Sequence, residues 1–126
     1  MISQYLENRV LGKIFRREDF EVPAVYISLH KSAPGDDGAG EINGGNYRRR
    51  AAEFGPVTLG TARNTRVLEW DQLPAGEIRH VGFWDAVRAG HFLWGASLGH
   101  RAALSAGDAF RIGIGDIIIS FGEGEP

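Results

Sequence analysis

Residues 25–30 read VYISLH, and this short stretch decides the fold. Val25, Ile27 and Leu29 alternate with more polar side chains, which is the pattern of a strand that buries one face. The same design recurs toward residue 121 in short segments separated by turn residues. Short strands with turns about every 8–12 residues predict an antiparallel sandwich or barrel. No segment after residue 20 has the period of a second good helix.

The predicted strands follow one another along the whole chain. They lie at 25–30, 47–54, 57–59, 61–70, 78–85 and 91–98, with a short one at Leu104 and one or two within 109–121. We therefore expect an all-β protein, an antiparallel, jelly-roll-like β-sandwich of about seven or eight short strands with one N-terminal α-helix. A chain of 126 residues suits one domain. We expect residues 1–126 to form it, with the helix and its connection in 1–20 and the sandwich in 22–121.

An apolar stripe precedes the strands and predicts the helix, in which Leu6, Val10, Leu11, Ile14 and Phe15 share one side. Ser3 suits the N-cap position. Gly12 weakens a helix by about 1 kcal/mol relative to Ala, so the helix needs support from outside. That support comes either from the end of its own core or from a neighbouring subunit, and the sequence leaves both open.

Charge and composition exclude several classes of partner. Lys and Arg total 14 against 16 Asp and Glu, a net charge of −2, which argues against binding to nucleic acid or to an anionic membrane. The longest aliphatic run, 117–119, is far shorter than the ~18 residues of a membrane span. The absence of cysteine excludes disulfides, thiolate metal sites and a cysteine nucleophile.

No motif predicts catalysis, a cofactor or a metal. The histidines (His30, His80, His91 and His100) lack metal-ligand spacing, and no Gly-x-Ser-x-Gly motif is present. Gly113-Ile114-Gly115 lacks the rest of a dinucleotide fingerprint. We therefore expect that the protein is not an enzyme.

The glycine-rich segment 31–46 has no apolar face and is expected to be a loop that is functional or ordered by a partner. Its carboxylates Asp36, Asp37 and Glu41 invite a calcium interpretation, but they lack EF-hand spacing, so a solvated acidic loop is favoured. Arg48 to Arg50 form no phosphate-binding track, because successive side chains of a strand point to opposite faces.

The segment 78–85 carries apolar residues on both faces, so a layer must cover each side of this strand. The outer layer is either a helix or another subunit. Gly82 is expected where a side chain would collide with a packed neighbour or strain the strand, because glycine otherwise only weakens a strand. At least one aromatic side chain is expected at an interface.

Several stretches together resemble a family of small phage and prophage proteins generally labelled tail fibre or minor virion protein. They are YLEN at 5–8, APGD at 33–36, GGNYRR at 44–49, IRHVGFWDA at 78–86, WGASL at 94–98 and AGD at 106–108. The resemblance implies a multi-copy structural component of the virion, assembled in the bacterial host cytoplasm and without enzymatic activity. Both a tail location and a capsid decoration role fit. The alternative is a β-sandwich that binds a host surface glycan or receptor through exposed aromatics.

The predicted partners are other copies of the chain and neighbouring virion proteins. A trimer would match the usual symmetry of phage appendages. The candidate interface residues are Leu6, Val10 and Ile14 on the helix, Asp36, Asp37 and Glu41 in the loop, and Tyr47, Arg48 and Trp84 on the strands. We also expect a partner to order the tail 122–126, and removal of residues 35–45 to leave a folded domain that no longer assembles.

Overall fold

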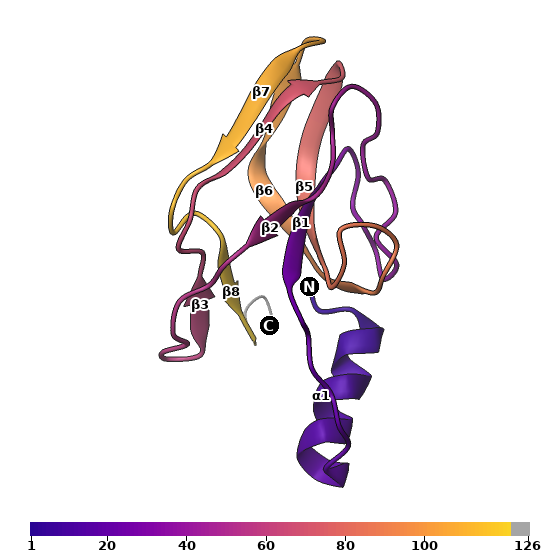
Figure 1. Ribbon diagram of the computed structural model, residues 1–126, viewed down its shortest axis with the longest axis vertical. Coiled ribbons are helices and arrows are strands. Elements are labelled where there is room, and N and C mark those ends of the chain that lie inside the picture. The colour runs from indigo at the N-terminus through magenta and orange to yellow at the C-terminus, as the bar shows by residue number, and fades with distance from the viewer. Residues whose placement is uncertain (122–126) are drawn as a thin grey trace.

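The computed structural model describes residues 1–121, and of residues 99 and 100 only the backbone. Within these residues the chain forms one helix and eight strands (Figure 1). The helix is α1 (Gln4–Arg16), and the strands are β1 (Val25–His30), β2 (Arg50–Ala52), β3 (Thr61–Arg63), β4 (Leu68–Leu73), β5 (Gly76–Trp84), β6 (Phe92–Leu104), β7 (Asp108–Ile112) and β8 (Ile118–Ser120). The predicted tail segment 122–126 lies outside the described residues.

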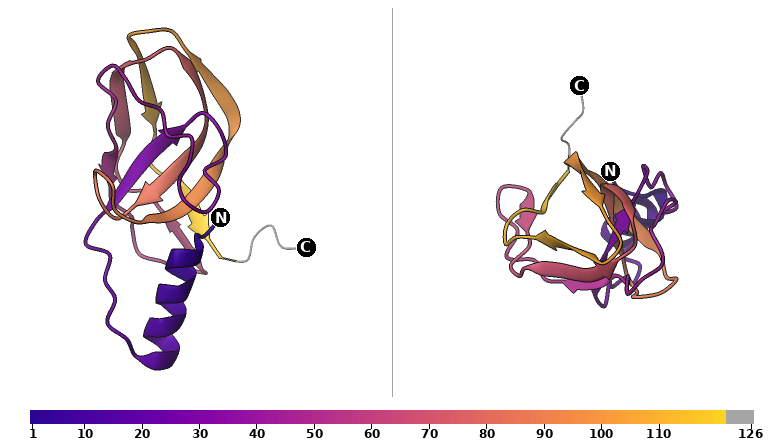
Figure 2. Two further views of the ribbon diagram at one scale, coloured as in Figure 1. Left: turned by 90° about the vertical axis from the view of Figure 1, so that its right-hand side faces the viewer. Right: turned by 90° about the horizontal axis from the view of Figure 1, so that it is seen from above.

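The strands form two layers, as the alternation in the sequence predicts. One layer is a four-stranded sheet in the order β2-β1-β5-β6, and the two-stranded sheets β4-β7 and β3-β8 lie across from it. All of these pairs are antiparallel. Figure 2 shows the layers curling around one interior. The all-β, sandwich-like class is therefore confirmed.

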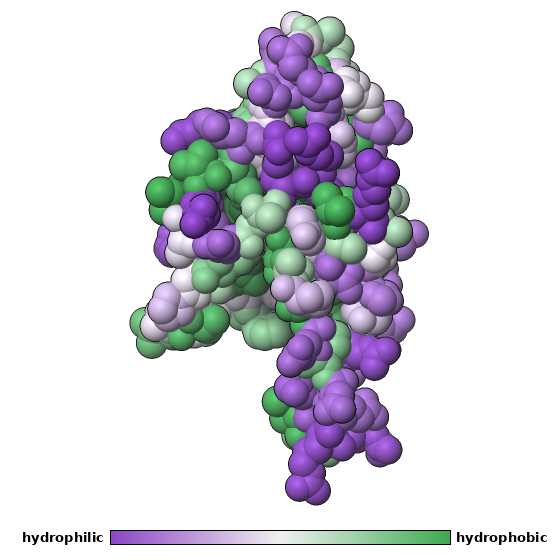
Figure 3. Space-filling model, in the orientation of Figure 1, coloured by the Kyte–Doolittle hydropathy of each residue, from purple (hydrophilic) through white to green (hydrophobic). Residues whose placement is uncertain are grey.

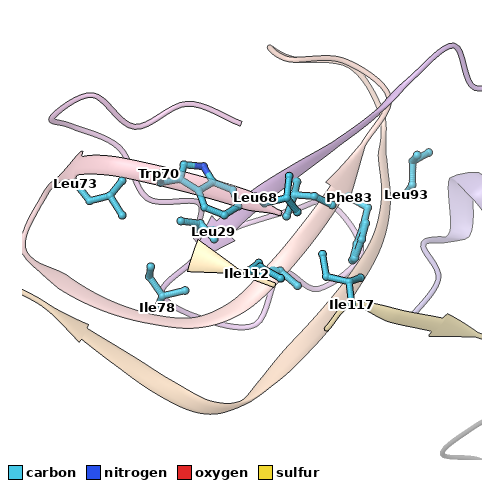
Figure 4. Packing of buried hydrophobic residues seen from close by; sticks show 11 residues of the cluster. Leu29, Leu68, Trp70, Leu73, Ile78, Phe83, Leu93, Ile112 and Ile117 are labelled. Atoms are coloured by element: carbon cyan, nitrogen blue, oxygen red, sulfur yellow. The ribbon is translucent and has the colours of Figure 1, made fainter. Parts of the chain in front are cut away.

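The interior is filled by side chains from both layers (Figure 4). Ile27, Leu29 and Ile78 come from the large sheet and are fully buried. Trp70 enters from β4, and its indole Nε1 donates a hydrogen bond of 2.8 Å to the carbonyl oxygen of Arg48. The alternation of residues 25–30 thus directs the apolar side chains of β1 into the shared core.

The segment 61–70 was expected to be one strand, and this prediction is wrong. The chain leaves β3 at Asn64 and reaches β4 only at Leu68. The Asn64 side chain is buried; its Nδ2 donates to the carbonyl oxygens of Arg66 and Gly113, and its Oδ1 accepts from the Ile117 amide. A side chain that satisfies backbone groups in this way replaces a strand ladder at the corner.

Other boundaries also differ from the sequence-based expectation. The strand expected at 47–54 is shorter and comprises only β2 (Arg50–Ala52). Residues 57–59 form no strand; Thr58 and Thr61 pair across a tight turn in which Leu59 has φ 51°. The strand predicted at 91–98 continues as β6 to Leu104, with an irregular register opposite β5 between Ile78 and His80. The segment 109–121 forms two strands, β7 and β8.

The helix projects from one end of the sandwich and does not lie over a sheet (Figures 1 and 2). Ser3 is its N-cap, and the Ser3 hydroxyl oxygen accepts a hydrogen bond from the Leu6 amide. The chain turns back at Arg17, which adopts φ 57°, and returns toward β1. We call the end from which α1 projects the base of the sandwich.

Candidate assembly surfaces

The loop 31–46 covers the outer face of the large sheet. Gly38 packs so closely that a Cβ there would overlap the Trp84 ring and lie 2.9 Å from Cδ1 of Phe92. Two backbone hydrogen bonds, from Lys31 to Gly40 and from Ile42 to Leu29, fix the ends of the covering segment. The outer layer predicted for strand β5 is therefore this loop, and not a helix or another subunit.

A polar network centred on Arg49 holds the loop to the sheet. The Arg49 guanidinium donates to both carboxylate oxygens of Glu41, at 3.1 and 3.0 Å, and to the carbonyl oxygens of Ala86 and Ala89. It also lies 3.7 Å from the centre of the Trp84 ring. The Tyr47 hydroxyl donates to Glu41 at 2.6 Å, and burial, together with this hydrogen bond, raises the pKa of Tyr47. The loop is thus ordered from within the chain.

A second buried contact joins β1, β5 and the loop. Trp84 Nε1 donates to the Ser28 hydroxyl oxygen at 2.8 Å, and the Ser28 hydroxyl lies 2.6 Å from His30 Nε2. His30 Nδ1 lies 2.8 Å from the Ala39 carbonyl oxygen. Because a carbonyl can only accept, Nδ1 carries the proton and Nε2 accepts from Ser28.

The serine and histidine of this contact would suit a nucleophile and base by residue type, but their surroundings give them a structural part. Ser28 and His30 are both fully buried. Burial also lowers the pKa of His30, which favours the neutral ring. Neutral His30 satisfies both of its neighbours, so the contact locks the loop onto the sheet.

Only the first part of α1 packs on the sandwich. The Tyr5 ring stacks on His91 with 4.1 Å between the ring centres. The backbone amide of Gln4 donates a hydrogen bond of 2.7 Å to the Asp36 carboxylate. The His91 ring in turn lies 2.9 Å from a carboxylate oxygen of Asp85. Farther along the helix, Leu11, Ile14 and Phe15 are 55%, 63% and 77% exposed. The apolar stripe therefore begins against the protein and ends in solvent.

An apolar pocket opens at the base, beside the root of α1. Its volume is about 170 Å³. The lining residues come from the helix, from β1, β3, β5, β6 and β8, and from the segment after β2: Leu6, Val25, Phe54, Ala62, Phe83, Leu93, Trp94 and Ile119. The Phe121 ring lies 5.6 Å from that of Trp94, at the edge of this region. We call this the base pocket.

A further apolar surface lies along β3, β8 and their turns. Its members are large and more than half exposed: Val57, Leu59, Ile114, Ile118 and Phe121. Figure 3 shows this apolar surface on the β3 and β8 side, continuing into the region between β3, β8 and the helix. Polar residues cover most of the rest of that view. We call these five residues the β3–β8 patch.

Comparison with known protein families identifies the family of the chain. The family model described as podophage GP4 fiber I protein gp80 matches residues 1–120. The chain belongs to this podophage fibre protein family. Membership makes it a phage fibre-type protein, and thus a structural component of the virion. A search of curated proteins found no match.

In this fibre-family chain the predicted helix residues lie at graded exposure. Leu6 lines the base pocket, Val10 is half-buried and Ile14 is exposed. In the loop, Asp36 accepts from the Gln4 amide, and Asp37 accepts from the Ala39 amide at 3.2 Å. Among the side chains that the structure describes, which leave out residues 99, 100 and 122–126, no group of acidic or histidine residues is arranged to hold a metal ion.

The other predicted interface residues face inward, with one exception. Glu41 and Tyr47 are half-buried in the Arg49 network, and Trp84 is 8% exposed. Arg48 is exposed.

The helices in the described part of the chain include none long and apolar enough to cross a membrane.

Sequence reasoning missed the pairing of Arg49 with Glu41 and the exposure of the β3–β8 patch. The inward direction of Arg49 follows from the alternation of residues 48–50, which places it opposite its neighbours, and it is 8% exposed. Its carboxylate partner eight residues earlier could not be predicted, since the loop between them has no regular period.

Proposed function

We propose that this protein is a multi-copy module of a phage tail fibre that acts by protein–protein assembly. Its partners are other copies of the chain and adjoining virion proteins. The family match supports a fibre location over a capsid decoration role. Assembly takes place in the host cytoplasm, before the particle is released.

The single observation that carries this proposal is the exposed apolar end of α1. Large apolar side chains gathered on a projecting element mark an interaction site, since soluble monomers seldom expose them in groups. Leu11, Ile14 and Phe15 form such a group. The β3–β8 patch provides a second apolar surface on the same chain.

Host glycan recognition has less support from the geometry. Sugar-binding sandwiches present exposed aromatic faces, whereas Trp70 and Trp84 are 1% and 8% exposed and Trp94 is half-buried beside Phe121. The tryptophans serve the core and its covering loop. A glycan array probed with the purified protein tests this alternative directly.

The proposal is tested on purified particles of the phage or prophage that encodes the chain. Mass spectrometry should detect the protein, in several copies per particle, in particles purified through a density gradient. Electron microscopy with antibody labelling should place it on the fibres. Label confined to the capsid, or absence of the protein from intact particles, would refute the proposal.

A further inference from the structure

The base pocket is a site for an apolar group of defined size. A cavity of about 150 Å³ lined by apolar side chains accommodates one benzene molecule, and the base pocket measures about 170 Å³. Its walls include the rings of Phe54, Phe83 and Trp94, which favour an aromatic occupant. The pocket therefore suits one phenyl ring.

Among the phenylalanine side chains, all of which the structure describes, that of Phe15 is the most exposed, at 77%. It cannot enter the pocket of its own copy. Leu6 lines that pocket, and Phe15 lies nine residues farther along α1. That separation is about 13 Å along the helix axis, which is longer than a phenylalanine side chain, and its roughly 2.5 turns put the two residues at opposite edges of the apolar stripe. Phe15 is directed away from its own pocket.

We propose that Phe15 of one copy inserts into the base pocket of a second copy, and that this contact joins the subunits. The inference deepens the proposed function and rests on it. The knob and the hole are different surfaces, so every copy offers one of each. Contacts of this kind close into a ring, such as the expected trimer, or continue as a filament, according to the rotation between neighbours.

The exposed apolar area matches what such a contact needs. The helix end and the β3–β8 patch together present eight large apolar side chains, each more than half exposed. Their combined area is on the order of 1,000 Å², which is the lower limit of a specific interface. Figure 3 shows apolar atoms on the side of the helix that faces β3 and β8. A second helix entering this region would contact both surfaces.

The contact is tested with two complementary variants of the full chain. Phe15→Ser removes the knob and keeps the pocket. Ala62→Phe fills the pocket from β3 and keeps the knob, since Ala62 is a lining residue. Val87→Ser is the matched control, because Val87 is apolar, 44% exposed and outside both surfaces. Circular dichroism and melting temperature establish that each variant folds.

Analytical ultracentrifugation gives the decisive masses. The wild type and Val87→Ser should form oligomers, while each complementary variant alone should be a monomer, with a dissociation constant raised roughly 30-fold or more. An equal mixture of the two variants should form a heterodimer, because one intact knob meets one intact pocket. Ala62→Leu is used in place of Ala62→Phe if the larger ring prevents folding.

Several outcomes would overturn the proposal. They are a monomeric wild type, a Phe15→Ser variant that keeps the wild-type mass, and a mixture that stays monomeric. A photo-crosslinking amino acid at position 15, in assembled particles, should react with a peptide that contains Phe83 or Trp94. A crosslink only to a different virion protein would also refute the contact between copies, while leaving the fibre location intact.

Discussion

Gly82 shows how one small residue permits the buried contact between the sheet and its covering loop. A Cβ at this position would lie 2.5 Å from the Ser28 hydroxyl oxygen and 2.7 Å from His30 Nε2. Real Cβ atoms do not approach other atoms this closely, so the Ser28 and His30 side chains would have to move. The collision predicted from the sequence is confirmed, and its partner is the Ser28–His30 pair.

Replacement of Gly82 by Val should therefore lower stability by about 2 kcal/mol or more. The melting temperature should fall by about 5–10 °C for a chain of this length. Ala51→Val is the control, since Ala51 is exposed on the short strand β2 and the larger side chain meets solvent there. Equal melting temperatures for Gly82→Val and the control would contradict the packing argument.

His30 gives the protein a pH-dependent stability of known sign. Burial lowers its pKa in the folded protein below the unfolded value of about 6.5. A lowered pKa means that the unfolded chain binds the proton more readily. The contribution of His30 to the free energy of unfolding is therefore fully present above about pH 6.5. It declines as the pH falls toward the folded pKa, by at most about 1.4 kcal/mol per pH unit for one proton.

Urea unfolding at pH 7 and pH 5 should show this decline in the wild type. His30→Gln should lose less stability between the two pH values, although it starts less stable because it disturbs the contacts to Ser28 and Ala39. The other histidines are present in both proteins, so their effects cancel. The same slope in both proteins would exclude His30 as the cause.

At the scale of elements, the loop 31–46 is part of the sandwich although it contains no strand. It supplies Glu41 to the Arg49 ion pair and places Gly38 on the Trp84 ring. Removal of residues 35–45 would uncover Trp84 and leave the buried Arg49 without its carboxylate. We therefore expect the deletion to lower the stability of the sandwich, and the prediction that it leaves a folded domain that no longer assembles stays a prediction.

Gly38→Ala tests the covering role of the loop without deleting it. Gly38 has φ +80°, and a Cβ there would overlap the Trp84 ring, so the loop should lift and stability should fall by about 2–4 kcal/mol. Gly35→Ala is a matched control in the same loop, because Gly35 has φ +65° but open space around its Cβ position. The control should show only backbone strain of about 1–2 kcal/mol.

Limited trypsin digestion provides a second readout of the same variant. Lys31 is exposed at the start of the loop, and its amide bonds to the Gly40 carbonyl oxygen. Cleavage after Lys31 should be faster in Gly38→Ala than in Gly35→Ala. Identical cleavage rates would show that the loop stays closed without the Gly38 contact.

At the scale of the whole molecule, polar and apolar surfaces are separated. The covering loop lies on the opposite side of the molecule from β3 and β8 (Figure 1), whereas the end of α1 and the β3–β8 patch leave large apolar side chains in solvent (Figure 3). A module with this asymmetry is stabilised by association, because burial of the apolar surfaces favours the assembled state.

The melting temperature should consequently rise with protein concentration. Differential scanning fluorimetry from about 1 to 100 μM should show a rise in the melting temperature of the wild type. Only folded subunits associate, so a higher concentration favours the folded state by mass action. Phe15→Ser should melt at one temperature across the range. High salt should leave the shift in place, because apolar contacts are not screened. A concentration-independent wild type would contradict assembly through these surfaces.

The sequence by itself determined the elements whose signal is local. The alternation at 25–30 predicts β1 and its buried face, the stripe from Leu6 to Phe15 predicts α1, and Ser3 predicts the N-cap. These signals are local because strand and helix periods bring together residues two to four positions apart. The resemblance carried by motifs spread over the chain likewise predicted the phage fibre family.

Only the tertiary structure decided what covers the strands and which side chains stay exposed. Trp84 meets Ser28, 56 residues earlier, and Arg49 meets Ala89, 40 residues later. No period along the chain connects such positions. The sequence places Leu6 and Phe15 on one stripe, but the sandwich shields the first and leaves the second in solvent. Burial depends on which segments return to a residue from far along the chain, and that is settled only when the layers pack.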